Sequence, residues 1–256
     1  MVFLIENESA AGVMKYEAEV LKDVIKASRF HRCVHLDMLS LRQVLSADTF
    51  RDIHDTIIPF GSIEFVELWY RKYYNIPHIN PMEIPRCLRL DYFLKRRYDI
   101  VKFEDLPSDG TWFIKDVSRL KSFFCVGNKT NIDPAVVNTT HWFQCSEYVP
   151  DIMAEYRLYF IEGSLENVCN YNGIPIHPID YDLIMRADGM LKLQADYPGS
   201  YTMDVMVSGR GTALIELHPF ICVGLYSTLW GDNLINAYID GHRYIRDFNT
   251  ACYLQE

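Results

Sequence analysis

The stretch that decides the fold is residues 201–226, YTMDVMVSGRGTALIELHPFICVGLY. Two runs of alternating polarity flank the glycine-containing SGRG at 208–211, a pattern that predicts two antiparallel strands joined by a tight turn. A three-residue loop, Gly209 to Gly211, brings Asp204 directly opposite Glu216. A two-residue loop would shift the register by one residue and mix the carboxylates into the apolar layer. We therefore predict the three-residue loop.

This register separates the hairpin into an apolar face and a polar face. The apolar face is suited to a core and carries Tyr201, Met203, Val205, Val207, Ala213, Ile215 and Leu217. The polar face carries Asp204, Glu216 and His218. Carboxylates directly opposed on neighbouring strands repel, because their Cβ atoms lie only about 4.5–5.5 Å apart. Either a hard divalent cation shared with substrate phosphates offsets this repulsion, or the two acids line a solvated sheet face.

The composition bounds the kind of protein. A chain of 256 residues can hold one large domain or two to three small lobes. Its 49% hydrophobic, 14% aromatic and 23% charged residues indicate a globular, soluble protein. The net charge of -9 argues against binding to nucleic acid or to an anionic membrane through bulk charge, although a local basic pocket for phosphates stays open. No apolar stretch approaches membrane-spanning length, and the amino-terminal residues lack the basic region of a secretory signal.

The cysteines indicate a reducing compartment. There are 7, an odd and widely scattered set without a CxxC pair, as is typical of thiols in the cytoplasm. We therefore expect a cytoplasmic protein. His31 and His35 bracket Cys33, but the alternation of the surrounding RCVHLDML favours one face of a strand over a metal site.

Along the chain, the amino-terminal part alternates strands and helices, which predicts a small parallel sheet. The strands are expected at 2–5, 33–39 and 56–59, and the helices at about 12–28, from 46 onward and through 65–73. The remainder reads as an α+β region. Its strands are expected at 99–103, 112–115, 141–148 and 155–163 before the hairpin, and its helices at about 87–97, 181–190 and 234–253.

Basic residues accompany the two acids. Lys115 ends the strand WFIK, and Arg157 lies within a strand beside Glu155. The chain has no GxxxxGK[ST] run, no GxGxxG opening a helix and no GxSxG elbow, which excludes a P-loop and weighs against a dinucleotide fold and a serine hydrolase. Cations beside a pocket with two carboxylates are typical of phosphate handling, where Lys and Mg²⁺ share the charge of a nucleotide triphosphate.

The ordered set FIK, EYRLYFIEG, YTMDV and IELHPF resembles the ATP-grasp superfamily. It is most similar to the small clade of compact ATP-grasp proteins that are often found in phages and bacterial conflict loci. The resemblance covers about residues 99 to 230. It implies an α/β and α+β chain with an ATP-grasp fold, in which two α+β lobes follow a small parallel-sheet amino-terminal domain. The implied bounds are 1–98 for that domain, 99–148 for the small lobe and 149–256 for the large lobe with its metal-binding hairpin.

The resemblance also implies roles for individual residues. Lys115 would contact nucleotide phosphates, as would Lys121, which precedes a phosphate-covering loop at 123–130. The hinge residues Ser146, Glu147, Tyr148 and Val149 would hold the adenine, mainly through backbone groups. Glu155 would bind the ribose, and Arg157 would lie near the transferring phosphate. Asp204, Glu216 and His218 would be the metal ligands, for one or two Mg²⁺ ions.

His218 departs from the family pattern, in which asparagine usually stands at this place. Imidazole is a poorer magnesium ligand than an amide oxygen and suits zinc, copper or iron better. Either the metal preference therefore differs in this chain, or His218 contacts phosphate or substrate instead of the metal.

The activity that the resemblance implies is that of an ATP-dependent carboxylate–amine ligase. It would form an acylphosphate and then an amide or peptide-like bond, with Lys115 and Arg157 as catalytic residues and small-molecule or peptide substrates. Two alternatives stay open: a small-molecule kinase that uses the same pocket, and a nucleotide-binding protein without enzymatic activity. The sequence carries no signal of the oligomeric state.

Overall fold

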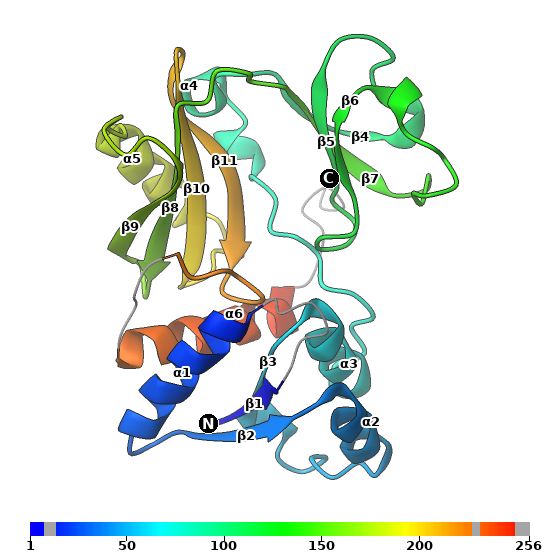
Figure 1. The fold of residues 1–256 in the computed structure, drawn as a ribbon, viewed down its shortest axis with the longest axis vertical. Helices are drawn as coiled ribbons and strands as arrows, with labels where there is room; N and C mark the ends of the chain where they lie inside the picture. The colour runs from blue at the N-terminus through cyan, green and yellow to red at the C-terminus, as the bar shows by residue number, and fades with distance from the viewer. Residues whose placement is uncertain (8–13, 227–230, 249–256) are drawn as a thin grey trace.

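The computed structural model describes residues 1–7, 14–226 and 231–248. Within these ranges the strands form three sheets, one in the amino-terminal part and one in each of two lobes above it (Figure 1). Their strand orders are β2-β1-β3, β4-β7-β5-β6 and β11-β10-β8-β9. No helix in the described ranges is long and apolar enough to cross a membrane.

The amino-terminal sheet is parallel, as predicted. Its strands are β1 (Val2–Glu6), β2 (Arg32–Leu36) and β3 (Ile57–Phe60), and its helices are α1 (Lys15–Ala27), α2 (Met38–Ser46) and α3 (Ile63–Tyr73). The C-terminal helix α6 (Asp232–Phe248) returns to this part of the molecule and packs against α1 and β3. The buried core around β1 therefore includes residues from both ends of the chain.

The prediction of a strand at 33–39 is wrong beyond Leu36, and so is the prediction that a helix opens at Ser46. The Asp37 side chain accepts a hydrogen bond from the Ser40 N–H at 2.6 Å, so it caps the start of α2, which ends at Ser46. A carboxylate at this position satisfies backbone donors that a continuing strand would not expose. Sequence alternation hid this cap, because it runs unbroken through the boundary.

The small lobe is a four-stranded antiparallel sheet. It consists of β4 (Tyr98–Lys102), β5 (Trp112–Asp116), β6 (Phe124–Gly127) and β7 (Trp142–Glu147). The predicted phosphate-covering loop at 123–130 is therefore mostly the edge strand β6, and the β5–β6 connection spans 117–123 instead. Short 3-10 helices occur at η1 (His54–Thr56), η2 (Arg86–Leu88), η3 (Phe103–Asp105) and η4 (Lys129–Asn131).

The long helix predicted at 87–97 is absent from this described segment. Only η2 and the four-residue α4 (Asp91–Leu94) form there. Lys95 ends α4 in the left-handed region at φ 51°. The following residue, Arg96, turns inward and donates to the Leu94 carbonyl at 3.0 Å and to the Leu214 carbonyl at 2.6 Å. The segment is thus shaped by a long-range contact with the hairpin, which local periodicity does not reveal.

The large lobe carries the hairpin of β10 (Tyr201–Ser208) and β11 (Gly211–Pro219), beside β8 (Ala154–Ile161) and β9 (Ser164–Gly173). Helix α5 (Tyr181–Leu191) contributes Leu183, Ile184 and Ala187 to the same core as Met203 and Val205. The strand β9 was not predicted from the sequence. Its residues, SLENVCNYNG, are too polar to suggest a strand.

The register of the hairpin agrees with the prediction at the acids but not at the turn. Ser208 pairs with Gly211, so the loop has two residues rather than three. A bulge between Asp204 and Val205 then shifts the pairing by one residue, and Asp204 lies opposite Glu216 as predicted. The bulge also changes the faces. Ala213 and Ile215, which were predicted for the core face, pack on the opposite face, whereas Leu214 enters the core.

The end of the hairpin is held against α6 by a very close backbone approach. A Cβ atom added at Gly241 would collide with the carbonyl oxygen and carbon of Phe220. Glycine at this position therefore lets the helix lie directly on the segment that follows β11. That segment, 220–226, borders the site described next.

Candidate functional site

Two adjoining cavities lie between the small lobe and the large lobe. We call the first the hinge cavity; it has a volume of about 280 Å³ and is lined by residues that include Gln144, Ser146, Val149, Glu155 and Met206. We call the second the loop cavity; its volume is about 420 Å³ and its lining includes Lys115, Lys121, Arg157, His218 and Tyr226. Phe113 and Glu216 line both cavities, so these two residues mark where the cavities meet.

At this junction, Glu216 is bound by a cation from the opposite lobe. The Lys115 ammonium, at the end of β5, donates to Glu216 Oε2 at 3.0 Å, and His218 Nε2 lies 2.8 Å from Glu216 Oε1. Burial alone would raise the pKa of the Glu216 carboxyl, but His218 and Lys115 hold that pKa well below its usual range. Burial likewise tends to lower the pKa of Lys115, and the carboxylates of Glu216 and Glu83 raise it instead. Glu216 and Lys115 are therefore both charged.

Asp204 is paired with Arg157 across β10 and β8, where the two residues are direct neighbours in register. Arg157 Nε donates to Asp204 Oδ1 at 2.7 Å, and Nη2 donates to Oδ2 at 2.7 Å. The two side chains are 6% and 2% exposed, so the pair is shielded from water. Arg157 Nη1 also donates to the Gly224 carbonyl at 2.9 Å, which ties the segment after β11 to the site. Burial opposes the charge on Arg157, but Asp204 raises its pKa above the usual value.

Two tyrosines that the sequence did not single out cover the Asp204–Arg157 pair. The rings of Tyr171 and Tyr226 stack with centroids 4.8 Å apart, and the Arg157 guanidinium lies 4.8 Å from the Tyr226 ring centroid. The Tyr171 hydroxyl donates to Asp204 Oδ2 at 3.5 Å. Burial, together with the charges of Asp204 and Glu155, raises the pKa of Tyr171. Tyr171 lies on β9, so the failure to predict that strand concealed its place in the site.

The hinge residues line one wall of the hinge cavity. The Glu147 N–H donates to the Arg97 carbonyl at 2.9 Å and the Tyr148 N–H to the Thr111 carbonyl at 3.3 Å, so both are used within the chain. The Val149 N–H has no acceptor in the described part of the chain. The Glu147 carboxylate accepts from Arg210 Nη2 at 2.8 Å.

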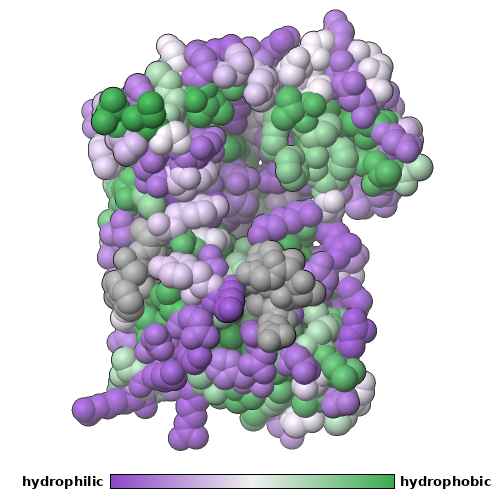
Figure 2. Space-filling model, viewed as in Figure 1, coloured by the Kyte–Doolittle hydropathy of each residue, from purple (hydrophilic) through white to green (hydrophobic). Residues whose placement is uncertain are grey.

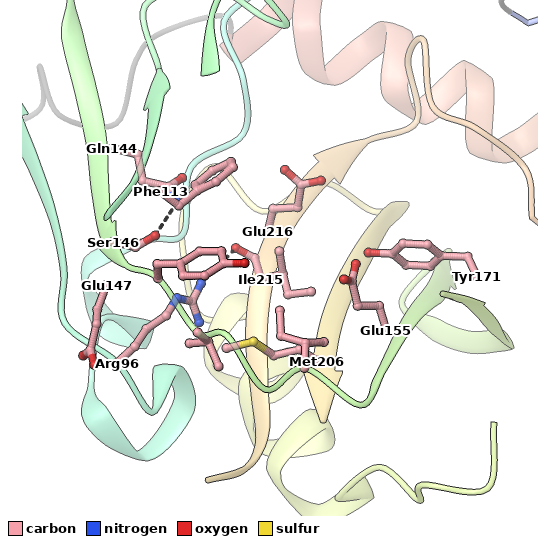
Figure 3. A pocket seen from close by; sticks show the side chains of 13 residues that line it. Arg96, Phe113, Gln144, Ser146, Glu147, Glu155, Tyr171, Met206, Ile215 and Glu216 are labelled. Atoms are coloured by element: carbon pink, nitrogen blue, oxygen red, sulfur yellow. Dashed lines mark hydrogen bonds between the residues drawn. The ribbon is translucent and has the colours of Figure 1, made fainter. Parts of the chain in front are cut away.

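Figure 3 shows the side chains around the hinge cavity, with Gln144 and Ser146 at one end and Glu155 and Tyr171 at the other. Glu155 Oε1 accepts from Asn172 Nδ2 at 3.0 Å. Gln144 is 5% exposed, and its amide donates to the Ser146 hydroxyl at 3.5 Å. Arg96, Gln144 and Tyr171 are the lining residues that the sequence analysis missed. The first two carried no local signal, because they become functional candidates only when the lobes come together.

The predicted metal ligands are close enough to share one ion. Asp204, Glu216 and His218 offer ligand atoms that all lie within 4.8 Å of one another, and they form the one such group of three found among the described residues. Arg157, Lys115 and His218 occupy positions beside these carboxylates, but each carboxylate oxygen has a second lone pair to offer. Two carboxylates and an imidazole thus fit a divalent cation.

Comparisons with known proteins agree with this architecture. A family model described as an ATP-grasp domain, the second family of its clade, matches residues 93–232, more than half of the chain. A search of curated proteins gave no match.

Solved structures with a similar fold cover almost the whole chain. A D-alanine–D-alanine ligase from Bacillus anthracis has a TM-score of 0.58 at 11% identity, over 97% of this chain and 99% of that one. The same ligase complexed with ATP has a TM-score of 0.53 at 12% identity, over 96% and 97%. D-cycloserine synthetase DcsG has a TM-score of 0.53 at 9% identity, over 98% and 100%. At such identities the likeness shows the fold, and the predicted ATP-grasp fold is confirmed.

Proposed function

This chain belongs to the ATP-grasp superfamily, and from that premise we propose that it is an ATP-dependent ligase that joins a carboxylate to an amine. The solved neighbours in fold are named a ligase and a synthetase, and one of them was solved with ATP. Their names support the class of reaction but not a particular substrate.

The observation that carries the proposal is the meeting of two cavities at one ion pair. The hinge cavity is of a size and lining suited to a nucleoside, and the loop cavity offers room for a second molecule. Lys115 and Glu216 lie where the first cavity opens into the second. A nucleotide held in the hinge cavity would point its terminal phosphate at whatever occupies the loop cavity, which is the arrangement that phosphoryl transfer requires.

The hinge cavity has the groups that an adenine base needs. Val149, Met206 and Ile215 form one apolar cluster along its wall. The Val149 N–H is free to donate to a ring nitrogen, since no group in the described chain accepts from it. Glu155 lies at the far end of the same cavity, where its carboxylate would accept from the ribose hydroxyls. We propose these roles for the two residues.

The phosphates would be bound by Lys115, Arg157 and Lys121, which line the loop cavity. Asp204, Glu216 and His218 would hold a divalent cation, which when bound supplies further charge neutralisation for the terminal phosphates. Lys115 and Arg157 are positioned by buried ion pairs, so they would meet the developing charge without reorganising.

The proposed chemistry requires no protein nucleophile. An oxygen of the substrate carboxylate bonds to the γ-phosphorus while the bond between that phosphorus and the β–γ bridging oxygen breaks, which releases ADP and leaves an acylphosphate. The amine nitrogen then bonds to the acyl carbon, phosphate leaves, and the nitrogen loses a proton. The protein contributes positioning and stabilisation of negative charge.

ADP release in the presence of hydroxylamine tests the proposal, because hydroxylamine converts an acylphosphate to a hydroxamate whatever the natural amine is. We expect hydroxamate from a pool of carboxylic acids, and we expect Lys115→Met to lower the rate by about 100-fold or more. Lys102→Met is the matched control, since Lys102 also lies on the small lobe and donates only to the Thr140 carbonyl. A stable phosphorylated product that forms without any amine would instead identify a kinase. ATP binding without ADP release would leave a nucleotide-binding protein.

A further inference from the structure

The loop cavity has a charge pattern that restricts which carboxylates it can accept. Resting on the ligase function proposed above, we propose that this cavity selects carboxylic acids that carry no ammonium group beside the carboxylate and have an apolar or aromatic flank. Des-amino acids and N-acylated amino acids belong to this class. Zwitterionic amino acids do not.

The first observation is an excess of cationic groups. Lys115, Lys121 and Arg157 line the loop cavity, and Glu216 is the one carboxylate among its described lining residues. Lys115 is paired with Glu216, and Arg157 is paired with Asp204. Lys121 differs, because its ammonium donates to the Cys222 carbonyl at 3.0 Å and has no carboxylate partner within the described ranges. Lys121 therefore brings an unbalanced positive charge to the cavity.

The second observation is that no acid in the described lining is free to receive an ammonium group. Both oxygens of Glu216 are engaged, Oε2 by Lys115 and Oε1 by His218. Glu17, behind the wall formed by 224–226, accepts from the Leu225 N–H at 3.0 Å. An ammonium group would thus enter a cavity with a surplus of positive charge, and like charges at close range repel. A carboxylate would find an unpaired cation in Lys121.

The third observation concerns the flank of the substrate. The loop cavity is walled by the rings of Phe113, Phe123, Phe124 and Tyr226 and by the aliphatic side chains of Leu120 and Ile221. Phe124, on the edge strand β6, is 71% exposed. Figure 2 shows hydrophobic side chains gathered on this face of the small lobe, over β5 and β6. A substrate with an apolar or aromatic body would cover these rings.

Binding of three matched ligands tests the inference without requiring turnover. The full chain, saturated with a non-hydrolysable ATP analogue and Mg²⁺, is titrated by calorimetry with 3-phenylpropionate, N-acetyl-phenylalanine and phenylalanine. We expect the first two to bind at least about tenfold more tightly than phenylalanine. Phenylalanine binding as tightly as the other two would overturn the inference, as would the absence of binding by all three.

Variants separate this role from phosphate binding. Lys121→Met should weaken binding of 3-phenylpropionate by about 10- to 100-fold and leave the affinity for the ATP analogue unchanged. Lys102→Met should change neither affinity. If Lys121→Met weakens only the ATP analogue, Lys121 is a phosphate contact and the inference fails, although the ligase proposal survives. If the selective binding is seen but none of the bound acids yields hydroxamate with ATP and hydroxylamine, the inference stands and the ligase proposal fails.

Discussion

Replacing Asp204 by asparagine should reveal how far the buried Asp204–Arg157 pair supports the large lobe. The two side chains form a two-pronged ion pair with both distances at 2.7 Å, and they are 2% and 6% exposed. The substitution would leave Arg157 as a buried cation without its counter-charge. Breaking a buried pair on one side costs about 3–5 kcal/mol. For a chain of this size, that corresponds to a fall in melting temperature of about 6–20 °C.

A double-mutant cycle measures the interaction and separates it from catalysis. Thermal unfolding is followed by circular dichroism for Asp204→Asn, Arg157→Met and the double variant. We expect each single variant to be strongly destabilised and the double variant to be more stable than additivity allows, because no unpaired charge is left. ADP release should be lost in all three. Additive effects on the melting temperature would refute the inference that the pair is coupled, and ADP release restored in the double variant would refute the metal role of Asp204.

Three further changes test the packing around the site. Gly241→Ala should destabilise the protein by about 2 kcal/mol or more, because the new methyl group meets a backbone carbonyl, whereas Gly189→Ala should stabilise by about 0.5–1 kcal/mol, since nothing lies within 4 Å of its Cβ position on α5. Urea unfolding measures both, and equal effects would contradict the close approach at α6. His242 is buried, and burial lowers its pKa from 6.5 to about 4; the unfolded chain therefore binds the extra proton first, and about 3 kcal/mol of stability should be lost as the pH falls from about 6.5 to 4. Unfolding at several pH values checks this, and an unchanged pH slope in His242→Phe would count against it. Glu67→Gln, which leaves Arg119 without the carboxylate that it binds at 2.8 Å, should destabilise by about 3 kcal/mol and expose the 117–122 connection to protease; limited proteolysis with wild-type kinetics would contradict that role.

The hairpin shows both the strength and the limit of sequence reasoning. Alternating polarity was enough to predict two strands, and the need to keep carboxylates out of the core was enough to place Asp204 opposite Glu216. The turn was wrong because one residue can be absorbed either in the loop or in a bulge, and both solutions give the same pairing at the acids. The choice is made by Arg96, which donates to the Leu214 carbonyl beside the bulge. That contact joins residues 118 positions apart, and no local pattern encodes it.

Residues that become functional only through long-range pairing were the ones that sequence reasoning missed. Lys115, Arg157 and Glu216 were found because charged side chains within apolar strands stand out. Tyr171 was missed because its strand is polar, and an isolated tyrosine is usually packing. Its significance comes from β8, which places it beside Asp204, and from the segment after β11, which stacks Tyr226 on its ring. Strand order, rather than composition, assigns it to the site.

The ion pairs at the junction also predict how nucleotide and cation affinities depend on each other. In this structure, Lys115 is held by Glu216 at 3.0 Å, so a phosphate must compete with that carboxylate for the ammonium group. Glu216→Gln removes the competing charge while it keeps a similar shape. We therefore expect the variant to bind a metal-free, non-hydrolysable ATP analogue about tenfold more tightly than the wild type does, and to gain less affinity when Mg²⁺ is added. Calorimetry in EDTA and in excess Mg²⁺ measures both quantities. A variant that binds the metal-free analogue more weakly than the wild type would show that Glu216 positions Lys115 for phosphate and does not compete with it.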